Sequence, residues 1–356
     1  MVGCVIAKND RVMGEGWHRR FGENHAEVEA LRACTGNPRG ATAYVSLEPC
    51  CHAGKTLPCT DILIQAGISR VVIAVRDPQR HTVRSGIEVL RRAGLQVDVG
   101  IESTNAAEVL ASYLTRVCLQ RPFVIAKWAQ SLDGKLSTRS GNSRWISNET
   151  SRRLAHKLRA RVDAILVGSQ TVIVDDPSLT ARNVPRQRRA KRIVLDTNLR
   201  LPLHCRLVET ARKIPTLIFT ATESATSPKA NRLRALGVQV EACRTRGDHV
   251  SLKAVLSRLA QLEVTNLLVE GGPTILTALF EADLVDEAHV FTAPLLIGGR
   301  HTPSVIGGRG ASAVSDARRP LSMKTRRCGN DTLHIMRFTD PPQTLPASAR
   351  ARPKRP

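Results

Sequence analysis

The chain contains few aromatic residues, no long apolar run and too few acidic residues to balance its basic ones. Aromatic side chains make up 3% of the 356 residues, so the stacking platforms that single-strand nucleic-acid binders use are largely missing. No apolar stretch approaches the roughly 20 residues of a membrane helix, and the N-terminus lacks the charged-then-apolar layout of a signal peptide. We therefore expect a soluble, cytoplasmic protein with no membrane partner.

The shortage of acidic residues leaves a formal net charge of +22. Such an excess could indicate a nucleic-acid partner, because clustered lysine and arginine neutralise backbone phosphates. Much of it falls, however, in a loop-like run and in the C-terminal tail, which we interpret as solvated segments. These residues are Arg186, Arg188, Arg189, Lys191 and Arg192, and Arg350, Arg352, Lys354 and Arg355. We expect anionic small-molecule ligands and no nucleic acid.

The length is sufficient for two cores, because single cores rarely keep growing past roughly 250 residues. β-Branched runs alternate with helical patterns throughout, which predicts an α/β protein. The predicted strands are 2–6, 12–17, 42–47, 71–75, 96–99, 123–129, 164–167, 192–196, 216–220, 266–269, 287–292, 324–328 and 333–338. The predicted helices are 25–33, 58–66, 85–93, 105–119, 149–161, 252–262 and 274–282. Arg121-Pro122 marks a boundary between domains at 1–120 and 121–340, and 341–356 is expected to be a basic, disordered tail.

Three residues in the first half have the chemistry of a metal site. The nine cysteines are scattered and odd in number, which in a large intracellular chain suggests metal ligation rather than a disulfide framework. His25, Cys50 and Cys59 stand at strand-to-helix junctions, where helix N-termini favour the thiolate form that zinc requires. Three protein ligands leave a fourth position open for water, as in a catalytic zinc site.

Glu27 follows the proposed ligand His25 by two residues, as in the H-x-E and P-C signature of zinc-dependent nucleobase deaminases. Its predicted role is to take a proton from water and deliver it to the departing amine. Eight residues separate Cys50 from Cys59, instead of the two in that signature. We interpret the other cysteines as core residues, and Cys51 as a neighbour that packs or points to solvent.

The segment Glu48-Pro49-Cys50-Cys51-His52-Ala53-Gly54-Lys55-Thr56-Leu57-Pro58-Cys59 resembles the deaminase half of the bifunctional riboflavin-biosynthesis deaminase-reductase family. The resemblance implies a three-layer, cytidine-deaminase-like N-terminal domain with bound Zn²⁺. It also implies that His52 and Gly54-Lys55-Thr56 lie near the substrate. Leu57 stands where the family usually has proline.

A buried strand in the second half runs into a Gly-rich turn and then a helix, over Leu267-Leu268-Val269-Glu270-Gly271-Gly272-Pro273-Thr274. Glycines let the backbone approach a phosphate, and the free N–H groups of the new helix point at it. Alone, this pattern favours a plain connector. The G-x-G-x-x-G fingerprint of Rossmann domains is absent, which disfavours a dehydrogenase of that type.

The segments Lys127-Trp128-Ala129-Gln130-Ser131-Leu132-Asp133-Gly134-Lys135 and Ser143-Arg144-Trp145-Ile146-Ser147 resemble the reductase half of the same family, and the likeness continues to about residue 338. It implies a dihydrofolate-reductase-like fold that uses NADPH. The residues implied to bind the cofactor are Ala129, Trp145, Thr171, Asp175, Thr197, Gly272, Pro273, Thr274, Ile275, Leu276, Thr277 and Ala278. Those implied to bind substrate are Ser143, Arg159, Leu179, Arg182 and Glu270; guanidinium groups suit a phosphate because they offer forked donors. Residues 175–182, with Thr171, are expected to form the loop beyond the strand at 164–167.

The resemblance implies riboflavin biosynthesis: hydrolytic deamination of a phosphorylated pyrimidine, 2,5-diamino-6-(phosphoribosylamino)pyrimidinone, and then NADPH-dependent reduction of its ribose to a ribityl chain. A homodimer is expected from the same resemblance. The family normally has a helix and an Asn-Pro loop before the Val-Gly at residues 2–3, so one alternative is a working reductase with an impaired deaminase. Another alternative is a basic nucleic-acid-binding or editing deaminase.

Overall fold

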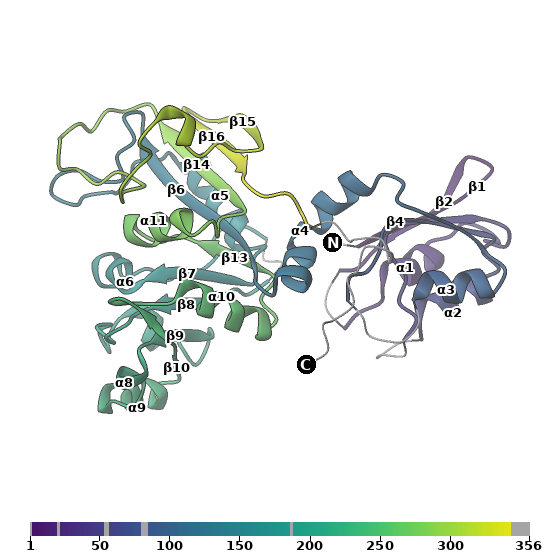
Figure 1. Cartoon of the computed structure of the whole chain (residues 1–356), viewed down its shortest axis with the longest axis horizontal. Coiled ribbons are helices and arrows are strands. Elements are labelled where there is room, and N and C mark those ends of the chain that lie inside the picture. Colours follow the sequence, from purple (N-terminus) through teal and green to yellow (C-terminus); the bar gives the residue numbers. More distant parts are fainter. Residues whose placement is uncertain (1, 20–21, 53–56, 80–84, 186–187, 343–356) are drawn as a thin grey trace. The chain divides into compact units, whose positions relative to one another are not determined.

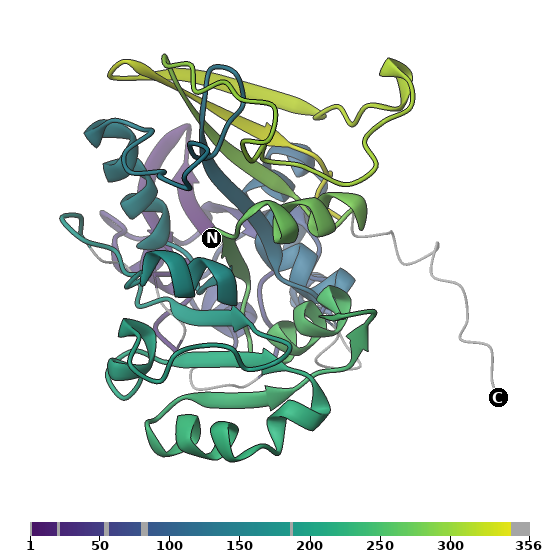
Figure 2. The same ribbon diagram turned by 90° about the vertical axis from the view of Figure 1, so that its left-hand side faces the viewer.

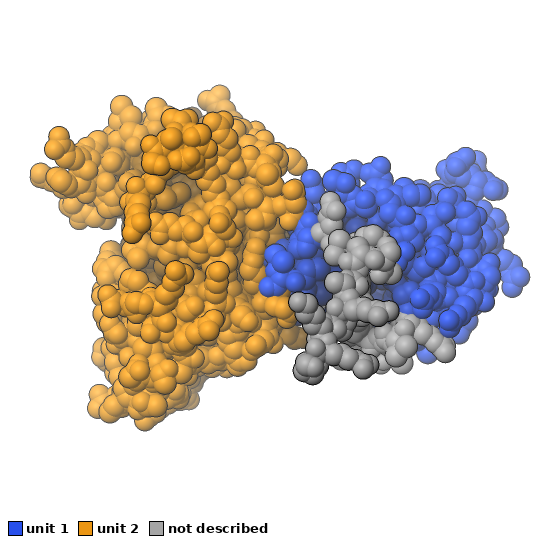
Figure 3. All heavy atoms as spheres, in the orientation of Figure 1, with its two compact units in different colours: residues 1–119, 341–356 blue, residues 120–340 orange. Residues whose placement is uncertain are grey.

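The computed structural model describes residues 2–19, 22–52, 57–79, 85–185 and 188–342. They form two compact units, one reaching Leu119 and one spanning Gln120–Asp340 (Figure 3). Gly54, Lys55, Thr56 and Arg186 and the predicted tail from residue 343 onward lie outside the described residues. No helix in the described part of the chain is long and apolar enough to cross a membrane.

The first unit is built on a five-stranded sheet in the order β2-β1-β3-β4-β5 (Figure 1). Its strands are β1 (Gly3–Lys8), β2 (Arg11–Trp17), β3 (Thr42–Leu47), β4 (Arg70–Val75) and β5 (Gln96–Val99). β1 runs antiparallel to β2 and β3, whereas β3, β4 and β5 are parallel. Its helices are α1 (Ala26–Arg32), α2 (Cys59–Gln65), α3 (Gly86–Arg92) and α4 (Ser103–Leu119). The strands and helices predicted in this half are confirmed.

Two glycines of β2 allow helix α1 to lie directly on the sheet. A Cβ atom at Gly14 or Gly16 would overlap the backbone of α1 at Ala30 and Ala26. The buried side chains beneath the helices include Ile6, Leu63, Ile73 and Leu90. This close contact fixes the N-terminal end of α1, where His25 and Glu27 lie.

The second unit contains a nine-stranded sheet in the order β10-β9-β8-β7-β13-β6-β14-β16-β15. Its strands are β6 (Phe123–Ser131), β7 (Ala164–Gly168), β8 (Lys191–Leu195), β9 (Thr216–Thr220), β10 (Gln239–Ala242), β13 (Asn266–Val269), β14 (Glu287–Ala293), β15 (Ser322–Cys328) and β16 (Asp331–Arg337). In this spatial order, all strands from β10 at one edge to β14 are parallel to their neighbours. The β15–β16 hairpin, in yellow in Figure 2, adds an antiparallel edge.

The helices of this unit are α5 (Glu149–Arg159), α6 (Ser169–Asp175), α7 (Arg206–Glu209), α8 (Thr222–Ala225), α9 (Pro228–Ala235), α10 (Leu252–Gln261) and α11 (Pro273–Glu281). A short 3-10 turn, η1 (Val314–Asp316), and a two-stranded ribbon, β11 (Thr245–Arg246) with β12 (His249–Val250), complete it. Sequence reasoning did not predict α7, α8, α9, β10 or this ribbon. They are short elements whose formation depends on tertiary packing more than on a long periodic pattern.

Two sequence predictions for this unit are wrong. Thr171 and Asp175 lie on helix α6, not in a loop, because the chain turns into a helix directly at the end of β7 and buries Val172. Arg192 is not in a solvated segment, since it is completely buried on β8. Its guanidinium donates to the Thr210 and Thr216 hydroxyls and to the carbonyls of Leu207 and Ile214. Hydrogen bonds to neutral groups thus replace a counter-ion for this buried charge.

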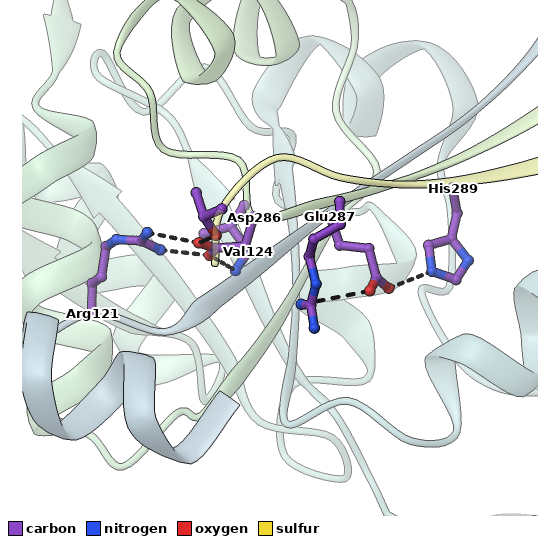
Figure 4. Close-up of polar contacts among 7 residues, drawn as sticks. Arg121, Val124, Asp286, Glu287 and His289 are labelled. Atoms are coloured by element: carbon purple, nitrogen blue, oxygen red, sulfur yellow. Dashed lines mark hydrogen bonds and ion pairs between the residues drawn. The ribbon is translucent and has the colours of Figure 1, made fainter. Parts of the chain in front are cut away.

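The carboxylate of Asp286, 1% exposed, joins the first and last segments of the second unit. Arg121 donates to both oxygens at 2.6 and 2.8 Å, and the Val124 N–H donates at 2.8 Å (Figure 4). The Thr339 hydroxyl donates to the same carboxylate at 2.7 Å. Asp286 therefore fixes the segment that enters β6 and the one that leaves β16.

Candidate functional site

Three side chains from separate junctions meet in the first unit. His25 is the N-cap of α1, Cys50 follows β3, and Cys59 is the first residue of α2. His25 Nδ1 lies 3.2 Å from the Cys59 Sγ and 3.4 Å from the Cys50 Sγ, and the three ligand atoms lie within 4.8 Å of one another. The structure thus brings together the three residues that the sequence predicts as metal ligands.

The geometry and chemistry of this cluster fit a zinc ion. Zinc–sulfur and zinc–nitrogen bonds of about 2.3 and 2.0 Å in a tetrahedral site place neighbouring ligand atoms roughly 3.5 Å apart. A hydrogen bond with the Cys59 side chain, together with His25, lowers the pKa of Cys50 to about 4, and the same hydrogen bond raises the pKa of Cys59. The thiolate form that a metal requires is therefore favoured at Cys50 before any ion binds.

Glu27 lies in the first turn of α1 and is 3% exposed. Burial raises the pKa of this carboxyl above the usual range, because a low-dielectric environment penalises the charged form. A carboxyl with a raised pKa accepts and returns a proton near neutral pH more readily than an exposed one. The position and environment of Glu27 therefore suit proton transfer beside the metal.

Glu48 supports the metal site in a way that sequence reasoning missed. Its two carboxylate oxygens accept the backbone N–H groups of Asp77 and Ile87, each at 3.2 Å. A Cβ at Gly86 would overlap the Pro49 carbonyl, so α3 begins in direct contact with the turn that carries Cys50. An acidic residue directly before Pro49-Cys50 was the available signal, since such a residue can bind backbone amides.

His18 is a second neighbour of the metal cluster. Its ring stands edge-on to the ring of His25, with centroids 5.4 Å apart, and its Nδ1 lies 3.0 Å from the Asn24 carbonyl oxygen. The structure thus makes His18 a polar neighbour of the cluster. Cys51 and His52, which adjoin the cluster along the chain, are partly buried.

A second group of polar residues lies beyond the carboxyl ends of the central strands in the second unit. Arg159, the last residue of α5, pairs with Glu270, which follows β13. The Glu270 side chain is 8% exposed. Burial opposes its ionisation, but the charges of Arg159 and Lys127 prevail and hold the pKa of Glu270 at about 2. The structure thus joins two residues, 111 positions apart, that the sequence assigned to one substrate site.

Lys127 on β6 is a functional candidate that sequence reasoning left without a role. Burial lowers the pKa of its ammonium group, and Glu270 opposes this effect. Its Nζ lies 5.9 Å from the centre of the Phe291 ring. The available signal was a lone lysine in an otherwise apolar strand sequence, Phe123-Val124-Ile125-Ala126-Lys127.

Residues 177–182, here called the substrate loop, carry two further predicted contacts. Leu179 is 3% exposed and has a φ of +49°, a conformation that a branched residue adopts only when its surroundings hold it. Arg182 is exposed, and its backbone N–H lies 3.3 Å from His156 Nδ1. The loop therefore places Leu179 inward and Arg182 near Arg159 and His156.

An open cleft of about 370 Å³ contains two of the predicted site residues. Ser143 lies on one wall and Asp175, at the end of α6, on the other, and Arg144 and Arg206 add positive charge. The Arg144 guanidinium donates to the Asp175 carbonyl at 2.7 Å. Trp145, next along the chain, is 69% exposed, and the Arg152 guanidinium lies over its ring, 4.7 Å from the centroid.

The start of α11 has the free N–H groups that a phosphate needs. Gly272 is its N-cap and has no side chain with which to cap the helix, and Pro273 is in the first turn. Gly168 and Gly271 lie against Ile275, where added Cβ atoms would come within 3.0 Å. The end of β7 and the start of α11 are therefore adjacent.

Other predicted cofactor residues have partners within the protein. The side chain of Leu276 is fully buried in the core, so only its backbone could face a ligand. The Thr277 hydroxyl accepts from the Gly307 N–H at 2.8 Å, and that of Thr197 from the Val250 N–H at 3.2 Å. Ala129 is partly buried and Thr274 is exposed.

Sequence comparisons relate both units to known proteins. Residues 1–75 match the cytidine and deoxycytidylate deaminase zinc-binding region, and residues 122–334 match the RibD C-terminal domain. The chain is 41% identical over 330 residues to the riboflavin biosynthesis protein RibD of Aquifex aeolicus, covering 93% of this chain and 90% of that protein. It is 37% identical over 306 residues to RibD of Escherichia coli, covering 83% of this chain and 82% of that protein.

Solved structures show the same relationship. RibD of Acinetobacter baumannii superposes with a TM-score of 0.83 at 32% identity, covering 95% of this chain and 92% of that chain. A diaminohydroxyphosphoribosylaminopyrimidine deaminase/5-amino-6-(5-phosphoribosylamino)uracil reductase of Thermotoga maritima gives a TM-score of 0.79 at 31% identity, with the same coverage. The similarity therefore extends over both units of the chain.

Proposed function

The chain belongs to the RibD family of bifunctional riboflavin-biosynthesis enzymes, and we propose that the residues brought together in its two units perform the two reactions of that family. It is a deaminase and reductase whose cofactors are zinc and NADPH. The first unit has the cytidine-deaminase-like fold and the second the dihydrofolate-reductase-like fold. The proposed domain limits are residues 1–120 and 121–340.

In the deaminase domain, His25, Cys50 and Cys59 would hold the zinc ion. The observation that carries this proposal is the convergence of their three ligand atoms next to buried Glu27. A zinc ion at this position would lower the pKa of a coordinated water molecule and so supply a nucleophile near neutral pH. Glu27 would accept the proton of the attacking water and pass it to the departing amine, which leaves as ammonia.

The proposed deaminase substrate is 2,5-diamino-6-(phosphoribosylamino)pyrimidinone. This choice is supported by the name of the Thermotoga maritima relative, which is described as acting on a phosphoribosylaminopyrimidine. Its product would be the corresponding uracil. His18, whose ring stands edge-on to that of His25, would contact the ring of this substrate.

In the reductase domain, the substrate would lie at Ser143, Arg159, Leu179, Arg182 and Glu270. Arg182 is exposed and suits the substrate phosphate, whereas Glu270 can accept hydrogen bonds from ribose hydroxyls. Trp145, Thr171 and Asp175, with Ala129, Thr197 and the first turns of α11, would bind the cofactor. NADPH bound by these residues would supply the hydride that reduces C1 of the ribose. Lys127 is partly buried, and its pKa is lowered by burial; it would donate the proton that the ribose oxygen takes up as the ring opens.

A direct assay tests both halves. Purified zinc-loaded protein is given the diaminopyrimidinone phosphate, and ammonia release and NADPH oxidation are followed together. We expect the protein to release ammonia even when no NADPH is added. We expect it to oxidise NADPH only after the uracil product has formed. Zinc-loaded protein that releases no ammonia, and that oxidises no NADPH when the uracil is supplied directly, would contradict the proposal.

The proposed partners are limited to the phosphorylated pyrimidine and a second copy of the chain, in the cytoplasm. The support for a homodimer is strand β15, an edge strand in which Ser322–Arg327 are all exposed. An unpaired strand edge offers its backbone N–H and C=O groups to another chain. Sedimentation equilibrium should give twice the mass of one chain, and a single-chain mass at micromolar concentration would reject the dimer.

A further inference from the structure

One nitrogen atom of His156 faces two backbone groups of the substrate loop. His156 lies on α5, one turn before Arg159. Its Nδ1 is 3.2 Å from the Thr180 carbonyl oxygen and 3.3 Å from the Arg182 backbone nitrogen. A ring nitrogen that carries a proton can donate to the carbonyl, and one without a proton can accept from the N–H, but it cannot do both. The protonation state of this atom therefore decides which hydrogen bond exists.

The charges around His156 oppose its protonation. Arg159 faces it from the same helix, and Arg182 faces it from the substrate loop. Glu270, after β13, is the carboxylate on this side, and it is already paired with Arg159 and faced by Lys127 of β6. Burial, followed by the charges of Arg159 and Arg182, lowers the pKa of His156 from its ordinary 6.5. The neutral ring is therefore the resting form at neutral pH.

We propose that His156 is a positioning residue of the reductase site, which anchors the substrate loop in its neutral form and releases Arg182 when it is protonated. The neutral ring that carries its proton on Nε2 accepts from the Arg182 N–H through Nδ1 and so fixes the position of that arginine. A proton taken from solvent at Nδ1 removes this acceptor and adds a positive charge beside two guanidinium groups. The strained backbone of Leu179, with its φ of +49°, then loses one of the contacts that hold the loop. This inference rests on the proposed role of Arg182 and Leu179 in substrate binding.

The first test compares pH profiles of the reductase. The ratio kcat/KM for 5-amino-6-(5-phosphoribosylamino)uracil is measured with NADPH in wild type and in His156→Gln, because this ratio reports groups of the free enzyme. Glutamine keeps an acceptor and a donor but does not titrate. As the pH falls from about 7.5 to about 4.5, the kcat/KM of wild type should fall further than that of the variant, by a factor that approaches about tenfold, the factor that one hydrogen bond represents.

Two features make this comparison specific. The substrate phosphate titrates equally in both enzymes, so its effect cancels. His249→Gln, at an exposed position of β12, should keep the wild-type profile. The fall in kcat/KM at acid pH should come mainly from a rise in KM, with kcat nearly unchanged. Parallel acid limbs in wild type and His156→Gln would overturn the proposal.

A second test needs neither substrate nor activity. In the substrate-free wild-type protein with zinc bound, NMR titration should show the His156 ring and the Arg182 amide changing with one common midpoint below 6.5. An Arg182 amide that does not respond to the titration of His156 would overturn the proposal even if the reductase is active. If the enzyme does not reduce the uracil at all, the proposed function fails, and the NMR result still decides the role of His156.

Discussion

Glu27 is the residue on which the proposed deaminase chemistry depends most directly. Its side chain is buried next to the metal ligands, and no other carboxylate among the described residues shares the first turn of α1 on the buried face. We predict that Glu27→Gln lowers the rate of ammonia release about 10²- to 10⁴-fold, the range attributed to one positioned proton-transfer group. Zinc content and NADPH oxidation on the uracil should stay at wild-type levels. Ammonia release at more than a tenth of the wild-type rate would show that Glu27 is not the proton carrier.

Glu270 predicts a pH dependence of stability in the reductase domain. Its folded-state pKa of about 2 lies below the ordinary 4.5, so its ionised form stabilises the fold above pH 4.5, and this stabilisation is lost as the pH falls from 4.5 toward 2. At pH 7, Glu270→Gln should reduce the free energy of unfolding by about 3 kcal/mol, because it leaves Arg159 and Lys127 without their carboxylate. Urea unfolding at pH 7 and at about pH 4 should show the difference from wild type shrinking in acid. A difference that does not change with pH would argue against this ion pair.

The residues that directly follow β3 illustrate how local contacts hold a proposed metal ligand in position. Glu48 binds the N–H groups of Asp77 and Ile87, and so ties the end of β4 and the start of α3 to the segment that carries Cys50. We predict that Glu48→Gln weakens zinc affinity about 10- to 100-fold, as is typical when outer-shell partners are removed. Competition with a chromophoric chelator measures this affinity without any substrate. Glu15→Gln, at an exposed position of β2, is the matched control, and equal affinities in both variants would contradict the role of Glu48.

The elements that could be predicted from sequence are those with a strong local pattern. The strands of both sheet centres consist of apolar β-branched runs, and the site residues His25, Cys50 and Cys59 belong to a motif with distinctive spacing. Helix α6 was missed because Val172, Ile173 and Val174 are β-branched and only one of them is buried. The burial of Arg192 and the role of Lys127 depend on partners more than 10 residues away in sequence, which a local pattern does not contain. The pairing of Arg159 with Glu270 likewise required the fold.

At the scale of the whole molecule, the two reactions are assigned to separate compact units, each with its own core and its own ligands. The three residues of the metal cluster all belong to the first unit. In the second unit, Asp286 bonds to Arg121 near its first residue and to Thr339 near its last. We therefore predict that removing zinc with a strong chelator abolishes ammonia release but leaves the rate of NADPH oxidation on the uracil within about twofold of its original value. The reason is that the three candidate zinc ligands all belong to the first unit.

The reciprocal change is Asp286→Asn. It should lower the midpoint of thermal unfolding of the reductase domain by several degrees, because Arg121 loses the charge of its partner while its other contacts remain. Zinc content and the rate of ammonia release should stay unchanged below that midpoint. If chelation also stopped NADPH oxidation on the uracil, or if Asp286→Asn released zinc, the two sites would be coupled and the assignment of one reaction to each independent unit would be wrong.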